Sequence, residues 1–121
     1  MISYVTIGTN NLEKAAKFYD AVLGVVGARR AMEMDRFVAW AGPSGGPMIM
    51  AMKPHDGKAA SVGNGMMVAL KASSKEMVDA VYKKALEMGG ADEGAPGERS
   101  KGVYAGYFRD LDGNKLNAIC M

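Results

Sequence analysis

The sequence predicts an α+β fold built from two βαβββ repeats, with one helix on the outside of each half of a curved mixed sheet. Three observations predict it: short strand-like segments, two segments with the apolar spacing of amphipathic helices, and a similarity between the two halves of the chain. A chain of 121 residues fits one domain, which we place over 1–121. Repeat 1 is expected at about 1–53, a linker at about 54–65 and repeat 2 at about 66–121.

The first repeat opens with a short strand rich in β-branched residues at 4–8. A helix follows, and we predict Asn10 as its N-cap, with Glu13 three residues later completing a capping box. Apolar residues then recur at intervals of three and four, which gives the helix one buried face. Gly24 and Gly27 are the expected stop signals.

The second repeat follows the same plan. A strand at 66–72 leads into a helix for which we predict the capping box Ser73 and Glu76, with Gly89-Gly90 as its end. The other strands are expected at 28–34, 36–41, 47–53, 103–109 and 115–120. Segment 91–101 contains Gly and Pro, so any strand there is predicted to be short or irregular.

An internal repeat links the two halves. Residues 4–28 lie over 67–91 without a gap, with six identities in 25 positions that fall on caps, helix faces and the helix stop. The closing hairpins also correspond, which places Ile49 over Asn117. A duplicated unit of this kind leaves the concave inner faces of the sheets to enclose a cavity.

Composition excludes several classes of partner. The net charge is +2 and the basic residues are scattered, so we expect neither nucleic-acid nor membrane binding. The single cysteine, Cys120, cannot form an internal disulfide, and the N-terminus has strand character without a signal-peptide pattern. We therefore expect a cytoplasmic protein.

Few residues suggest chemistry by themselves. His55, the only histidine, is either a general base or an inert linker side chain, and the absence of evident partners favours the second reading. Cys120 is interpreted as a packed thiol rather than a nucleophile. Gly63-Asn64-Gly65 precedes a strand, so a helix-terminus phosphate site does not apply. The stripe Met48, Met50 and Met52 is predicted to face the helix layer.

Two segments resemble a known family. The run 2–20, ISYVTIGTNNLEKAAKFYD, resembles the opening of the vicinal-oxygen-chelate proteins, a strand followed by D/N-L-x-x-A-x-x-F-Y. The ending 108–117, FRDLDGNKLN, resembles their closing R-D-P-D-G-N-x-x-E. This superfamily comprises glyoxalases, bleomycin-resistance proteins and extradiol dioxygenases, and the resemblance implies a barrel-like curved sheet.

The resemblance also implies where a metal would sit. Active members hold a divalent ion with a His on the first strand, a His on the strand opening the second half and a Glu on the last strand, and some add a carboxylate on the fourth strand. The corresponding residues in this sequence are Tyr4, Met67, Asn117 and Ile49. A phenol, a thioether, an amide and an alkyl group are poor ligands for such ions, so we expect no metal and no cofactor.

We therefore predict a metal-independent small-molecule binding protein that uses the cavity between the halves. The alternatives are a lyase, isomerase or dioxygenase-type enzyme with a displaced metal site, and a module whose role is dimerisation. Catalytic residues cannot be assigned, and the family analogy suggests a homodimer. The cavity candidates are Tyr4, Thr6, Trp40, Ile49, Met67, Ala69, Tyr104, Tyr107, Arg109 and Asn117.

Overall fold

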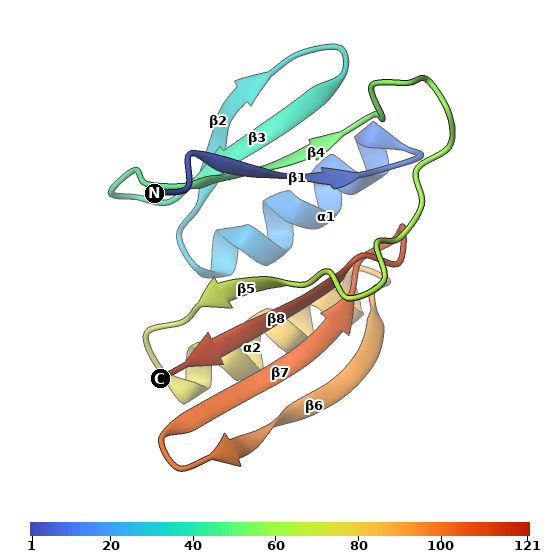
Figure 1. Cartoon of the computed structure of the whole chain (residues 1–121). Coiled ribbons are helices and arrows are strands. Elements are labelled where there is room, and N and C mark those ends of the chain that lie inside the picture. Colours follow the sequence, from blue (N-terminus) through green and yellow to red (C-terminus); the bar gives the residue numbers. More distant parts are fainter.

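The computed structural model describes residues 1–121 as two four-stranded sheets and two helices (Figure 1). The first sheet contains β1 (Tyr4–Gly8), β2 (Arg29–Glu33), β3 (Phe37–Ala41) and β4 (Met48–Met52), in the order β1-β4-β3-β2. The second contains β5 (Val68–Lys71), β6 (Ala91–Ser100), β7 (Val103–Arg109) and β8 (Lys115–Cys120), in the order β5-β8-β7-β6. The two repeats share one topology, which confirms the predicted fold class.

Both sheets are mixed, and they are separate. β1 runs parallel to β4 and β5 runs parallel to β8, while all other pairs are antiparallel. The edge strands β1 and β5 are not hydrogen-bonded to each other. The curved sheet is therefore open between the halves and does not close into a barrel.

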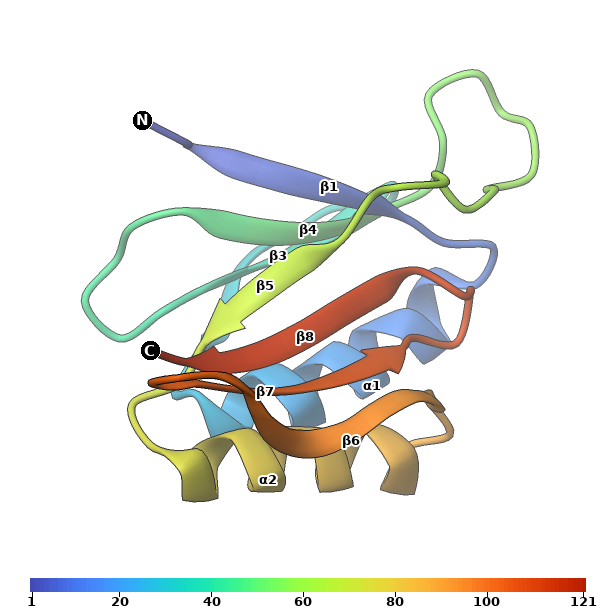
Figure 2. The ribbon, with the colours of Figure 1, turned by 60° about the horizontal axis from the view of Figure 1, so that its bottom comes forward.

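The helices α1 (Leu12–Val25) and α2 (Lys75–Glu87) lie on the same side of the strands (Figure 2). They contact each other, and one cluster of 18 buried hydrophobic residues runs from the first repeat to the second. Burial of these apolar faces is the main force that holds the two repeats together. Neither helix is long and apolar enough to cross a membrane.

Both predicted N-caps are wrong by one residue. Asn11 caps α1 by accepting a hydrogen bond from the Lys14 N–H, and Ser74 caps α2 in the same way. Asn10 is engaged elsewhere, because its side-chain amide pairs with the backbone of Ala60 in the linker. Adjacent Asn-Asn and Ser-Ser pairs can each supply a cap, and tertiary contacts decide which residue does so.

Strand β6 is irregular, as predicted, but it is not short. It covers ten residues and its pairing with β7 shifts register three times. Gly and Pro interrupt the regular ladder in this segment without ending the pairing. Because β6 is an edge strand, such interruptions leave the rest of the sheet intact.

Candidate ligand-binding site

The inner face of each sheet is the one turned away from the helices. In the first sheet, Thr6, Met50 and Ala39 stand side by side on neighbouring strands. Met50 and Ala39 are buried but lie outside the core cluster under the helices, whereas Trp40 belongs to that cluster. The prediction that the methionine stripe of β4 faces the helix layer was therefore wrong.

The error comes from the length of one loop. Residues 42–47 join β3 to β4, whereas residues 110–114 join β7 to β8, so the first hairpin is one residue longer. Thr6 pairs with Met50 just as Ala69 pairs with Asn117. Met50, and not Ile49, is thus the counterpart of Asn117, because a one-residue slip in a strand exchanges its two faces.

The ten cavity candidates divide between the two sides of the sheets. Those on the inner face are Tyr4, Thr6, Met67, Ala69, Tyr107, Arg109 and Asn117. Those on the helix side are Trp40, Ile49 and Tyr104. Trp40 donates from Nε1 to Asp20 on α1 at 2.9 Å, and Tyr104 donates from its hydroxyl to Asp79 on α2 at 2.7 Å.

The carboxylate of Asp20 is held in place by hydrogen bonds. The guanidinium of Arg30 donates two hydrogen bonds to this carboxylate, at 2.8 and 2.7 Å. These bonds, together with that from Trp40, hold the pKa of Asp20 below its ordinary value, although partial burial opposes the shift. The indole of Trp40 is consequently anchored in the wall of the fold rather than free to meet a ligand with its N–H.

An apolar groove runs between the edge strands β1 and β5. Its volume is about 670 Å³, within the range of small-molecule sites. The residues that form it include Val5, Trp40, Ile49, Met66, Met67 and Ala69. Four of the ten candidates therefore meet here, and Trp40 and Ile49 reach this groove from the helix side.

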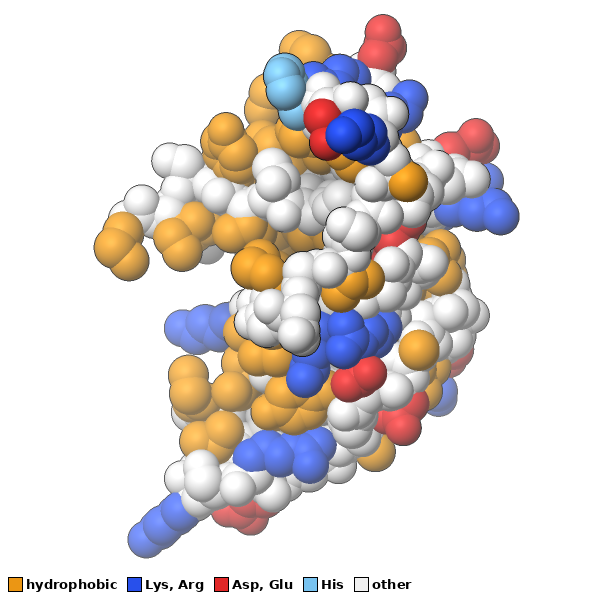
Figure 3. Space-filling model, turned by 45° about the vertical axis from the view of Figure 1, so that its right-hand side comes forward, with side chains coloured by type: hydrophobic (Ala, Val, Ile, Leu, Met, Phe, Trp, Pro, Cys, Tyr) orange, Lys and Arg blue, Asp and Glu red, His pale blue; other side chains and the backbone are white.

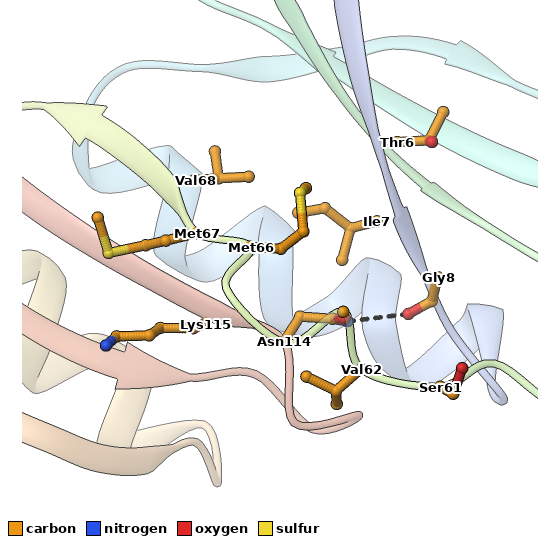
Figure 4. Close-up of a pocket in the computed structure, with 11 residues that line it drawn as sticks. Thr6, Ile7, Gly8, Ser61, Val62, Met66, Met67, Val68, Asn114 and Lys115 are labelled. Carbon is orange, nitrogen blue, oxygen red and sulfur yellow. Dashed lines mark hydrogen bonds between the residues drawn. The ribbon is translucent and has the colours of Figure 1, made fainter.

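A second groove, which we call the basic groove, opens next to the first. Its volume is about 630 Å³, and its lining consists of residues 62–67 together with Arg109 and Lys115. A smaller pocket of about 130 Å³ extends from it to Thr6 and Gly8 of β1 (Figure 4). The lining residues that the sequence analysis missed are Lys115 and the linker segment. Strand alternation from Asn117 would have indicated Lys115.

Asn117 lies in the middle of the inner face of the second sheet. It is 2% exposed, between Ala69 on β5 and Tyr107 on β7, and its Oδ1 atom has no hydrogen-bond partner. The Tyr107 ring beside it is contacted by two cations, Arg99 at 5.2 Å and Lys115 at 5.5 Å from the ring centre. A buried acceptor without a donor is rare in folded proteins and marks a position where a ligand could donate.

A hydrogen-bond network joins the two halves behind this site. The buried carboxylate of Asp110 accepts from the Tyr19 hydroxyl at 2.5 Å, and from the backbone and side-chain N–H groups of Asn114 at 2.9 Å. The Asn114 amide also donates to the Gly8 carbonyl of β1 at 2.9 Å. Burial, together with the neighbouring charge of Asp110, raises the pKa of Tyr19 well above its ordinary value.

This pKa shift predicts a loss of stability at alkaline pH. The unfolded chain releases the Tyr19 proton above pH about 10, whereas the folded chain keeps it, so the free energy of unfolding should fall there by about 1.4 kcal/mol per pH unit. Urea unfolding between pH 8 and 11 measures the slope. The variant Tyr19→Phe should show a shallower decline, and an unchanged slope would contradict the assignment.

Comparison with known proteins agrees with this geometry. The sequence profile of the glyoxalase/bleomycin resistance protein/dioxygenase superfamily matches residues 1–118. The chain belongs to this superfamily. A glyoxalase/bleomycin resistance protein from Albidiferax ferrireducens is similar at 35% identity, with a TM-score of 0.91 over 98% of this chain and 97% of that one.

Other solved structures of lower identity are also similar in fold. A hypothetical protein from S. aureus has 24% identity and a TM-score of 0.78, over 100% of this chain and 93% of that one. A lactoylglutathione lyase from Agrobacterium tumefaciens has 19% identity and a TM-score of 0.72, over 98% and 92%. At these identities the likeness shows the fold alone. A search of curated protein sequences finds no match.

Four inner-face residues bear on metal binding in this superfamily member. Tyr4, Met50, Met67 and Asn117 occupy the positions that the resemblance and the strand register assign to metal ligands. No three His, Cys, Asp or Glu side chains come close enough to hold a metal ion. These donors do not fit a divalent ion, which prefers imidazole nitrogen and anionic oxygen.

Two other residues lie away from the inner face. His55 is exposed on the linker, with its Nδ1 atom 3.4 Å from the Arg36 guanidinium. Cys120 is half-buried at the end of β8 and packs against the core under the helices. Neither residue has a neighbour that would convert it into a catalytic base or nucleophile.

Proposed function

We propose that this superfamily member binds a small molecule between its two halves, without a metal ion. The observation that carries the proposal is the buried, unpartnered Oδ1 of Asn117 on the inner face. Where the resemblance places a carboxylate ligand for a metal, this chain has a neutral acceptor that suits an N–H or O–H group of an organic ligand.

The groove between the two halves supports the same function. Its volume is large enough for a drug-sized molecule, its lining includes Ala69, the β5 neighbour of Asn117, and its methionine side chains can adapt to different shapes. The inner-face donors do not suit a divalent ion, as described above. Binding by apolar contact and a few polar groups is therefore the chemistry that these residues offer.

The enzyme alternative has less support. An exposed Tyr4 is the one inner-face residue at a family ligand position that could act as an acid or base, and it makes no hydrogen bond to the protein. General acid–base catalysis needs such a group to be held in position by neighbouring side chains. We therefore favour a binding protein over a lyase, isomerase or dioxygenase.

The variant Asn117→Leu tests the proposal. Leu has a similar shape and removes the unpartnered acceptor, so we expect the free energy of unfolding to rise by about 1–2 kcal/mol while ligand binding is lost. The matched control is Asn114→Leu, which removes an amide that donates to Gly8 and Asp110 and should destabilise the fold. Urea unfolding measures both variants.

The ligand itself is to be found by a thermal-shift screen of metabolites and antibiotics on chelator-treated protein, followed by calorimetry. We expect hits that bind wild type in the presence of EDTA and bind Asn117→Leu at least about tenfold more weakly. Binding that disappears with EDTA and returns with a divalent metal would overturn metal independence. Equal binding to Asn117→Leu would remove Asn117 from the site.

We also propose a homodimer in the cytoplasm. The inner face of the first sheet and its N-terminal end expose Ile2, Tyr4, Met32 and Met34, an apolar surface that a second copy would cover. The unpaired Cys120 suits a reducing compartment. Sedimentation equilibrium of the purified chain tests the dimer, and a monomer at micromolar concentration would contradict it.

A further inference from the structure

The inner faces of the two sheets differ in chemistry. On β4 the three inward side chains are methionines, Met48, Met50 and Met52. The corresponding side chains on β8 are Lys115, Asn117 and Ile119. One half therefore offers a soft apolar surface, while the other adds a cation and a neutral acceptor.

Lys115 is a half-buried cation without a counter-ion. Its ammonium group has no carboxylate within 4 Å, and its described contact is with the Tyr107 ring at 5.5 Å. Arg109, opposite it on β7, donates from Nε to Glu93 and from Nη1 to the Gly113 carbonyl. Its Nη2 atom has no protein partner, so both residues still have donors to offer to an anion.

The linker supplies backbone N–H donors to the basic groove, close to Lys115 and Arg109. Residues 63–66 form a turn closed by the Met66 N–H and the Gly63 carbonyl, with Gly65 in the left-handed conformation at φ +90°. The N–H groups of Gly63, Asn64 and Gly65 donate to no protein acceptor. Free backbone N–H groups next to two cations are a common arrangement for binding carboxylate or phosphate.

The apolar groove and the basic groove are neighbours. Met66 and Met67 line both of them. Figure 3 shows basic side chains gathered where the surface is hollowed between the two halves, next to hydrophobic ones. A molecule that lies in the apolar groove and extends past these two methionines would reach Lys115 and Arg109.

We propose that the ligand is an amphipathic anion, with its hydrophobic body in the apolar groove and its carboxylate or phosphate group on Lys115 and Arg109 under the 63–65 turn. This inference rests on the proposed function and specifies the ligand class. An apolar body accounts for the size and lining of the first groove. An anionic head accounts for the unpaired Lys115, which a neutral ligand would leave half-buried without a partner.

Calorimetry with three probes of equal chain length tests the class. Octanoate and octyl phosphate carry the two candidate head groups, and 1-octanol is the neutral reference. We expect the full chain to bind at least one of the anions about tenfold or more tightly than 1-octanol, and the tighter of the two identifies the head group.

Variants of Lys115 assign the effect to this residue. Lys115→Met should weaken the affinity for the preferred anion about tenfold and leave the affinity for 1-octanol unchanged. Lys115→Arg should bind the anion about as tightly as wild type. Lys101→Met is the matched control, because Lys101 lies in the β6–β7 turn and lines neither groove. Circular dichroism confirms that each variant is folded.

The outcomes separate this inference from the proposed function. If 1-octanol binds as tightly as both anions, or if Lys115→Met binds the anion like wild type, the ligand class is wrong and small-molecule binding in the groove still stands. If none of the three probes binds while the metabolite screen gives a neutral ligand that depends on Asn117, the ligand class is again wrong. Loss of all ligands from the screen would overturn the proposed function itself.

Discussion

Replacing Asp110 with alanine is expected to lower the free energy of unfolding by about 3–5 kcal/mol, the largest effect of any substitution we consider. Asp110 is 6% exposed, and its carboxylate accepts hydrogen bonds from Tyr19, from the Asp112 backbone and twice from Asn114. Alanine would leave the buried Tyr19 hydroxyl and these amides without an acceptor, and each unmatched buried donor costs free energy.

Urea unfolding measures the loss, and Asp112→Ala is the control. The Asp112 side chain accepts one hydrogen bond, from the Asn10 N–H, so its removal should cost only about 1 kcal/mol. The double variant of Asp110→Ala with Tyr19→Phe should lose less than the sum of the two single variants, because the two groups bind each other. Equal losses for Asp110→Ala and Asp112→Ala would show that the network does not hold the repeats together.

This network explains why two short motifs predict the fold so well. The Tyr at the end of the first motif and the Asp that opens the last hairpin are 91 positions apart in the sequence and bonded in the structure. Asn114 of the same hairpin reaches the Gly8 carbonyl at the end of β1. The residues that carry the family resemblance are therefore those that connect one repeat to the other.

Details at single-residue precision could not be read from the sequence. Asn10 and Asn11 are equally good caps in isolation, and the pairing of Asn10 with Ala60 in the distant linker decides between them. The register of β4 depends on a loop that is one residue longer than its counterpart. Gapless comparison of the hairpins placed Ile49 on the inner face, whereas Met50 occupies it.

The candidate site was predicted only in part, because it also depends on strand register and on the path of a loop. Alternation from Tyr4, Met67 and Asn117 places inner-face residues correctly once the strand register is known. The contribution of the 62–67 segment to both grooves could not be foreseen, because it depends on the path of the linker between the halves. Composition marks such a segment as a loop but does not say which surface it covers.

Gly90→Ala is expected to have the next largest effect, a loss of about 3 kcal/mol in the free energy of unfolding. A Cβ atom at this position would lie 2.7 Å from the Arg109 carbonyl oxygen and 2.8 Å from that of Ala85. The Phe18 ring of α1 is 3.2 Å away on the same side. Backbone atoms on two elements cannot both withdraw, so the start of β6 would shift away from β7 and from the end of α2.

Gly24→Ala is the matched control for this substitution. Gly24 lies within α1 with nothing within 4 Å of its added Cβ, so alanine should stabilise the helix by about 0.5–1 kcal/mol. Opposite signs for the two variants in urea unfolding would show that Gly90 is required by close approach rather than as a helix stop. Gly89, which has φ +95° directly after the α2 cap, fulfils that role in the second repeat, as Gly27 does in the first. A loss at Gly90 below about 1 kcal/mol would mean that α2 and β7 can separate at this point, and that the packing within the second repeat is softer than the contacts indicate.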